Sequence, residues 1–291
     1  VGAPPDPFAA DGQVWSLPPL DPIESARRGH APFVELIRAN MAHAGALRID
    51  HVLGLRRLFV VPDGAKGSEG AYLDQPFEDL IGQVTLESRR ARCVVVGEDL
   101  GVVPWGFRER MTEAAILSYQ VLWFEREGRG FRSPTTYPRS GTAVVGSHDL
   151  ATLAAWWTGD DIAEDLRLGR LAAEAGVGAR EGRVEEKRVL VETLVAAGRL
   201  AADHVAGGLP ATIDDAIVAA IHGWAASGPS LLALIQADDL SGEVERLNLP
   251  GTDRERPNWR RRLSVGVETL LKATRAEATL RAVADRRVEG A

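Results

Sequence analysis

Short apolar runs that end abruptly in charged residues recur along this chain. The run Ala46–Ile49 is followed by Asp50, and the run Val94–Val96 leads through Gly97 to Glu98. Between such runs, apolar residues recur at the spacing of one helix face. This alternation of short strands and helices is typical of a parallel α/β sheet. The pattern predicts strands at 46–50, 93–97, 117–124, 142–147 and 230–235, and helices at 31–43, 77–91, 105–115 and 259–283.

Three of the predicted strands deliver an acid at their carboxyl end. Asp50 and Glu98 close two of them, and Asp149 follows the strand at 142–147. A strand interior offers no water to solvate a carboxylate, so these acids must lie where the strands emerge or be paired. One such acid alone is more simply a helix cap or half of an ion pair. Three on the carboxyl ends of parallel strands indicate a catalytic face, because barrel enzymes place their active sites there.

Five β/α units predict an α/β fold of the (β/α)8 TIM-barrel class with helical insertions. A closed barrel needs eight parallel strands, so the N-terminal strands are expected to be missing and about the last five units present. We expect residues 1–291 to be the C-terminal part of one catalytic barrel domain, with a helical subdomain or insertion at about 160–227. The Pro- and Gly-rich residues 1–31 predict an ordered loop, and residues 54–75 predict an irregular one.

Composition narrows the class of protein. Hydrophobic residues make up 45% and charged residues 26% of the chain, which is typical of a globular protein. The formal net charge of −7 argues against a nucleic acid partner, and the absence of a long apolar stretch argues against a membrane one. The single cysteine, Cys93, opens an apolar strand and is expected to be a buried thiol. One cysteine and no export signal predict a cytoplasmic location.

The residues beside the acids suit carbohydrate chemistry. Two carboxylates that flank a glycosidic oxygen can cleave the bond, one as acid and one as nucleophile or base. Arg48 precedes Asp50 by two positions and therefore lies on the same side of the strand. The imidazoles of His51 and His148 can donate hydrogen bonds to sugar hydroxyls.

Several longer motifs, in order along the chain, resemble one enzyme family. The motifs are Gly2-Ala3-Pro4-Pro5-Asp6, Gly12-Gln13-Val14-Trp15, Ala46-Leu47-Arg48-Ile49-Asp50-His51, Val96-Gly97-Glu98-Asp99-Leu100-Gly101, Ser147-His148-Asp149-Leu150-Ala151-Thr152-Leu153 and Asn258-Trp259-Arg260-Arg261. Together they resemble 4-α-glucanotransferase, also called amylomaltase or disproportionating enzyme, of glycoside hydrolase family 77. The likeness covers nearly the whole chain.

The resemblance implies a role for each matching residue. Asp50 resembles the nucleophile that forms a covalent glucosyl-enzyme, Glu98 the acid/base, and Asp149 the third acid, which holds sugar hydroxyls. The residues that match substrate-binding positions of the family are Arg48, His51, His148, Asp6, Trp15, Tyr72, Asn248 and Gly251.

The function implied is retaining transfer of α-1,4-glucan segments between maltooligosaccharides or starch- and glycogen-derived glucans. The resemblance implies no metal or organic cofactor. Two alternatives stand beside it: an α-glucan hydrolase of the same barrel clan, and an inactive fragment. Five strands cannot close a barrel, and the outermost would present unpaired edges. We therefore expect the chain to require a missing N-terminal segment or another subunit as partner.

Overall fold

The computed structural model describes residues 1–5, 11–252 and 254–289. Its contacts divide the chain into two compact units, Val1–Tyr119 and Gln120–Ala291. Each unit has its own hydrophobic core and carries part of a parallel sheet. Among the described residues, no helix combines the length and the apolar character needed to cross a bilayer.

Three parallel strands form the centre of the first unit. β3 (Ala46–Ile49) pairs with β6 (Val94–Gly97), which pairs with β7 (Ile116–Val121). Parallel neighbours need a crossover connection, and α3 (Phe77–Ala91) and α4 (Phe107–Glu113) supply helices for it. The three strands predicted in this region are confirmed. The helix predicted at 77–91 is confirmed at both ends, whereas α4 is shorter than predicted.

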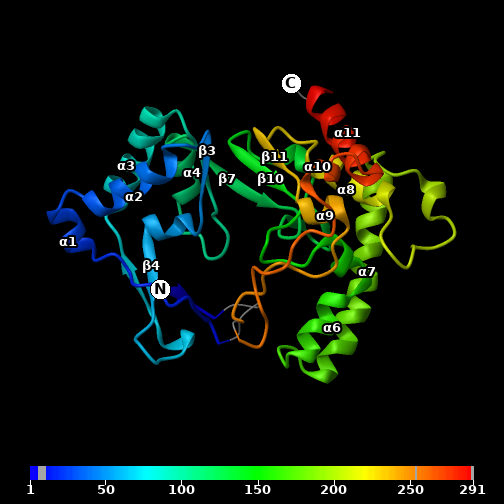
Figure 1. Cartoon of the computed structure of the whole chain (residues 1–291), viewed down its shortest axis with the longest axis horizontal. Coiled ribbons are helices and arrows are strands. Elements are labelled where there is room, and N and C mark those ends of the chain that lie inside the picture. The colour runs from blue at the N-terminus through cyan, green and yellow to red at the C-terminus, as the bar shows by residue number, and fades with distance from the viewer. Residues whose placement is uncertain (6–10, 253, 290–291) are drawn as a thin grey trace. The chain divides into compact units, whose positions relative to one another are not determined.

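Helices α2 (Ala31–Met41) and α3 cover this sheet in the blue to cyan part of Figure 1. α2 buries Phe33, Ile37 and Met41, the residues whose spacing predicts the helix. Glu87 of α3 accepts two hydrogen bonds of 2.9 Å from the guanidinium of Arg38, which ties the two helices together. Those hydrogen bonds lower the pKa of Glu87. Helix α1 (Pro22–Arg27) precedes α2.

A second, antiparallel sheet occupies a stretch for which the sequence predicts irregular structure. β4 (Arg57–Val60) pairs with β5 (Ala71–Asp74), and the short β1 (Gly2–Ala3) lies between β4 and β2 (Gln13–Val14). The prediction of loops at 1–31 and 54–75 is wrong at these positions. The pairing of β1 joins residues far apart in sequence, so no local pattern signals it. A Cβ at Gly2 would lie 1.9 Å from the carbonyl oxygen of Gln13, so only glycine permits this close approach. Short 3₁₀ turns at Val52–Leu55 and Gly67–Glu69 complete the region.

In the second unit, β10 (Gly141–Val144) and β11 (Leu232–Leu234) run parallel, with Thr142 opposite Leu232. The amide of Leu122, directly after β7, donates to the carbonyl of Val144 at 2.9 Å. β11 lies within the predicted strand 230–235, and β10 begins one residue before the predicted strand 142–147. A small hairpin joins β8 (Arg126–Glu127) to β9 (Gly130–Phe131).

Most of the regular secondary structure described in the second unit is helical, and these helices enclose its core. The core contains Trp157, Leu190, Leu194, Ile217 and Ile221, all fully buried. Within the described part of the chain, α7 is the longest helix and is labelled in Figure 1. The helices are α5 (Leu153–Thr158), α6 (Asp160–Arg167), α7 (Ala173–Ala196), α8 (Asp215–Ala225), α9 (Ala237–Ser241), α10 (Val267–Leu270) and α11 (Thr274–Glu289), with 3₁₀ turns at Pro134–Thr136 and Ala202–Val205.

The prediction of one helix over 259–283 is wrong in its first half. Residues 259–266 are not helical, and the helical residues begin with α10 and continue in α11. Trp259 has a φ of +61°, which is incompatible with a right-handed helix. Arg261 pairs with Asp238 at 2.6 Å, and Ser264 donates to Glu243. These tertiary contacts override the local helical preference.

Candidate active site

Strand register brings two candidate acids to one edge of the first unit. Ile49 at the end of β3 lies opposite Gly97 at the end of β6, so Asp50 and Glu98 leave neighbouring strands side by side. The amide of Glu98 donates to the carbonyl of Ile49 at 2.9 Å, and the amide of Val52 donates to the carbonyl of Glu98 at 2.9 Å. Neighbouring strands lie about 4.8 Å apart, so this register sets the separation of the two acids.

The backbone holds the carboxylate of Glu98 at both oxygens. Oε2 accepts from the amide of His51 at 2.9 Å, and Oε1 accepts from the amide of Leu100 at 2.7 Å. Glu98 is only 9% exposed, and this burial raises its pKa. The charge of Asp50 also raises the pKa, while the two hydrogen bonds and Arg48 oppose the shift. Glu98 therefore keeps its proton to a higher pH than an exposed glutamate.

Asp50 has a different environment. Its side chain is 73% exposed, and its Oδ1 lies 2.7 Å from a guanidinium nitrogen of Arg48. Arg48 in turn lies over the ring of Tyr119, 5.3 Å from the ring centroid. Asp50 is therefore an exposed carboxylate in an ion pair. Two neighbouring carboxyls therefore differ, one buried and one exposed and paired.

His51 and Trp15 form an aromatic pair beside these acids. Their ring centroids lie 5.0 Å apart in an edge-to-face arrangement. His51 has a φ of +46°, which turns the chain sharply after Asp50. Burial lowers the pKa of His51, although the charge of Asp50 partly opposes the shift. The indole nitrogen of Trp15 donates to the side chain of Gln13 at 3.0 Å.

Tyr72, another predicted site residue of this unit, does not join the cluster. Tyr72 lies on β5, with the guanidinium of Arg57 3.9 Å from its ring centroid and Phe59 against its edge. Within the described residues, no hydrogen bond, ion pair or ring contact links Tyr72 to either acid. Asp6 lies outside the described residues.

In the second unit, Asp149 meets two other predicted site residues. Its Oδ2 lies 3.2 Å from Nε2 of His148, and its Oδ1 accepts a 2.6 Å hydrogen bond from the side-chain amide of Asn248. The amide of Asp149 donates to the hydroxyl of Ser147 at 3.3 Å. Side chains rather than strand register therefore orient this acid.

The loop that carries Asn248 is built around a tight turn. The amide of Thr252 donates to the carbonyl of Leu249, with Pro250 and Gly251 between them. Gly251 has a φ of +78°, which together with the preceding proline is typical of a type II turn. The side chain of Asn258 closes the loop, accepting from the amide of Leu249 and donating to the carbonyl of Thr252. Gly251 thus shapes the loop that presents Asn248.

A buried ion cluster anchors that loop to α6. Arg246 and Arg256 each bond an oxygen of Glu164 at 2.8 Å, and Arg256 also donates to Asn258 at 2.6 Å. Burial acts to raise the pKa of Glu164, but the hydrogen bonds and charges of both arginines lower it overall. The sequence analysis does not single out these residues, because 82 and 92 positions separate the partners.

Trp259 and Asp239 are two further residues that pattern reasoning misses. The ring of Trp259 lies 5.1 Å from that of His148. Asp239 is buried and accepts from the amide of Leu153 at the start of α5, directly downstream of Asp149. Its other oxygen lies 3.0 Å from Nε2 of the buried His222. For Trp259, the sequence signal is the motif that contains it. For Asp239, the signal is its partner His222, a lone histidine in the apolar helix α8.

Cys93 is buried, as predicted. Burial raises the pKa of its thiol, which disfavours the nucleophilic thiolate. It therefore packs as a small apolar residue.

Parallel β/α units with carboxylates at the carboxyl ends of their strands are typical of (β/α)8-barrel enzymes, which carry their active sites at that edge. Comparison with known proteins places the chain in a family of that class. It belongs to the 4-alpha-glucanotransferase family, glycoside hydrolase family 77, whose family model matches residues 1–268.

Relatives and a solved structure agree with this assignment. The chain is 37% identical over 264 residues to 4-alpha-glucanotransferase of Haemophilus influenzae, covering 91% of this chain and 38% of the relative. It is 36% identical over 266 residues to that of Mycobacterium bovis, covering 89% and 36%. The crystal structure of amylomaltase from Corynebacterium glutamicum matches with a TM-score of 0.89 at 31% identity, covering 97% of this chain and 42% of that one.

The chain thus spans well under half the length of these relatives. Its five parallel strands correspond to part of a (β/α)8 barrel, as the sequence predicts. The assignment to glycoside hydrolase family 77 is likewise confirmed.

Proposed function

We propose that this chain carries the retaining transfer site of a 4-α-glucanotransferase, acting on α-1,4-glucans and maltooligosaccharides. The observation that carries the proposal is the pair Asp50 and Glu98, placed side by side by strand register and set in contrasting environments. Environments that separate two carboxyls into a charged and a protonated form define nucleophile and acid. Retention requires carboxyls about 5–5.5 Å apart, a separation that neighbouring strands allow.

In the first half of the reaction, the carboxylate of Asp50 attacks the anomeric carbon of the donor glucan. The bond from that carbon to the glycosidic oxygen breaks, and Glu98 gives its proton to the departing oxygen. The product is a covalent glucosyl-enzyme and a shortened glucan. The raised pKa of Glu98 supports its role, because the residue must be protonated at the outset.

In the second half, the 4-hydroxyl of an acceptor sugar attacks the same carbon. Glu98, now ionised, takes the hydroxyl proton, and the bond to Asp50 breaks. Both carboxyls return to their starting forms, so no external acid or base is consumed. Attack by water instead would give hydrolysis, so transfer requires that a sugar occupies the acceptor position.

We assign Asp149 to the sugar hydroxyls of the donor, with His148 and Asn248 beside it. A carboxylate there also favours the positive charge that develops on the sugar ring. Arg48, His51 and Trp15 are proposed to contact sugar near Asp50. The remaining proposed substrate-binding residues are Tyr72, Gly251 and Asp6.

Products from maltotriose test the proposal. A transferase yields glucose together with maltopentaose and longer chains, whereas a hydrolase yields only glucose and maltose. Chromatography of the early products separates the two outcomes. Accumulation of glucose and maltose without longer chains would favour the hydrolase and contradict the transfer proposal.

Covalent trapping tests the roles of the two acids. With a glucosyl fluoride, the leaving group needs no protonation, so Glu98→Gln should still form the glucosyl-enzyme but release it slowly. Mass spectrometry of the intact protein should show the adduct in Glu98→Gln and not in Asp50→Asn. An adduct mapped by peptide digestion to any residue other than Asp50 would refute the assignment.

We also propose that residues 1–291 belong to one catalytic barrel domain, with a helical insertion at about 160–227. The run of helices α6, α7 and α8 within this range supports it. A cytoplasmic location is proposed on the single cysteine, and cell fractionation checks it.

A further inference from the structure

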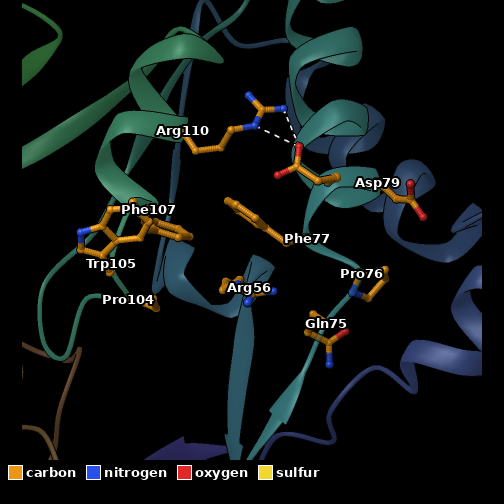
Figure 2. Close-up of a pocket in the computed structure, with 11 residues that line it drawn as sticks. Arg56, Gln75, Pro76, Phe77, Asp79, Pro104, Trp105, Phe107 and Arg110 are labelled. Atoms are coloured by element: carbon orange, nitrogen blue, oxygen red, sulfur yellow. Dashed lines mark hydrogen bonds and ion pairs between the residues drawn. The ribbon is translucent and has the colours of Figure 1, made fainter.

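A cleft of about 650 Å³ lies in the first unit, between the start of α3 and the start of α4. Figure 2 shows Trp105 and Phe107 on the left, Pro76 on the right and Phe77 between them, with Arg110 above Phe77 and Arg56 below it. No predicted site residue lines it. Its volume is within the range of sites that bind small organic ligands.

The aromatic side chains of the cleft have unequal exposure. Phe107 is buried and stacks on Phe77 with ring centroids 5.3 Å apart and an interplanar angle of 24°. Trp105 is fully exposed to solvent. Gly106, with a φ of +76°, turns the chain into α4 and leaves the indole projecting outward. The stacked rings of Phe77 and Phe107 thus form a packed part of the cleft lining, while the indole of Trp105, its largest aromatic group, is exposed to water.

The polar groups of the cleft are mixed in sign. Arg110 donates twice to Oε2 of Glu78, at 3.0 and 2.9 Å, and Asp79 lies 3.3 Å from His30. With Arg56, the lining has two guanidiniums and two carboxylates, so it offers no net charge to an ion. Gln75 adds an amide.

We infer that this cleft is a second α-glucan-binding site, separate from the acid pair. A flat indole covers the apolar face of a sugar ring, while amide, guanidinium and carboxylate groups bond its hydroxyls. A neutral polyhydroxylated ligand suits both features, whereas a peptide interface would need a larger apolar patch. The choice of an α-glucan rests on the proposed function.

A second site would retain long glucans on the protein between transfer events. Its loss should therefore weaken binding of glycogen and reduce transfer from long donors. Transfer from the short donor maltotriose should stay within about twofold, because among the described residues no hydrogen bond, ion pair or ring contact joins Trp105 to Asp50 or Glu98. This difference between long and short donors distinguishes a binding site from a structural effect.

The test is affinity electrophoresis of the purified protein in gels containing glycogen, with Trp105→Ala, Trp105→Phe and the matched control Leu36→Ala. Leu36 is also an exposed apolar residue, and it lies on α2 outside the cleft. Trp105→Ala should weaken the apparent affinity for glycogen at least fivefold, Trp105→Phe should retain part of it, and Leu36→Ala should match the wild type. Thermal unfolding of all four proteins verifies that they fold alike.

Equal retardation of Trp105→Ala and Leu36→Ala would overturn the inference. A change in sedimentation coefficient on Trp105→Ala without a change in glycogen affinity would assign the cleft to a second copy of the chain, which also overturns it. Failure of the proposed function is recognised separately, because then no variant and no wild-type protein would make maltopentaose from maltotriose.

Discussion

The two units hold their candidate acids by different means. In the first unit, strand register and backbone amides position Glu98 beside Asp50. In the second, Asp149 is oriented by the side chain of Asn248, which lies 99 positions away in sequence. Backbone positioning depends little on neighbouring side chains, whereas side-chain positioning depends on everything that supports the partner. The difference predicts that remote substitutions affect Asp149 far more than they affect the acid pair.

The largest expected effect is on the acid pair itself. In the proposed mechanism, Glu98→Gln removes the proton that the leaving oxygen needs, so the maximal transfer rate should fall by about 10²–10⁴-fold. The control is Glu109→Gln, an exposed glutamate on α4, which should retain full activity. Steady-state rates with maltotriose measure the effect. A Glu98→Gln protein within tenfold of the wild type would remove Glu98 from the mechanism.

Next in size is the anchor of the Asn248 loop. Arg256→Met removes one of the two arginines that pair with Glu164. Breaking a buried ion pair typically lowers the free energy of unfolding by about 3 kcal/mol. Urea unfolding measures the loss. The exposed Arg188, paired on α7 with Glu185 and Glu192, offers a control in Arg188→Met that should change stability little.

The same pair has a defined pH dependence. The pKa of Glu164 is lowered in the folded chain, so its contribution to stability is present above the ordinary glutamate range and is lost as the pH falls through the lowered pKa. The difference between wild type and Arg256→Met should therefore narrow on acidification. A difference that widens at acid pH would contradict this account of the anchor.

A smaller effect is expected from the partner of Asp149. Asn248→Ala removes a 2.6 Å hydrogen bond to a carboxylate, which typically contributes about 1.5–3 kcal/mol. We expect kcat/KM for maltotriose to fall between about tenfold and about 100-fold, without loss of stability. Asn40→Ala, at an exposed amide on α2, is the control. Unchanged kcat/KM would show that Asp149 needs no support from Asn248 and would contradict this contrast between the units.

The smallest effect concerns the pH profile. Arg48 acts to lower the pKa of Glu98, so Arg48→Met should raise that pKa further and move the alkaline limb of kcat/KM to higher pH. Arg38→Met, whose guanidinium pairs with Glu87 instead, should leave the limb in place. Movement of the limb to lower pH would mean that another group governs it.

In the first unit, the structure has Asp50 and Glu98 at the strand ends where the sequence predicts them, whereas in the second unit sequence patterns indicate Asp149 but not the residues around it. Asp50 and Glu98 directly follow apolar strands. The apolar run and the abrupt change to a charged residue are therefore enough to locate both acids. Asn248 is predicted only by resemblance to a family, and no sequence pattern points to Arg246, Arg256 or Glu164. Their partners lie far along the chain, and local sequence contains no signal for such contacts.

The same distinction applies to the fold. Helix α3 matches its prediction because its amphipathic spacing is local. The antiparallel sheet of β1, β2, β4 and β5 escapes prediction in part because the pairing of β1 with β4 joins Gly2 to Phe59, which are distant in the chain. Trp259 begins no helix, because ion pairs of Arg261 hold the neighbouring chain in place.

By itself, the sequence determines the parallel strands, the acids at their ends and the buried thiol of Cys93, since burial periodicity and the hydration of charge act over a few residues. Only the tertiary structure decides that Glu98 is buried while Asp50 is exposed, that Asn248 reaches Asp149, and that Trp105 projects from a cleft. The physical reason is that desolvation and side-chain hydrogen bonds depend on what surrounds a group in space, and that surrounding comes from segments distant in the chain.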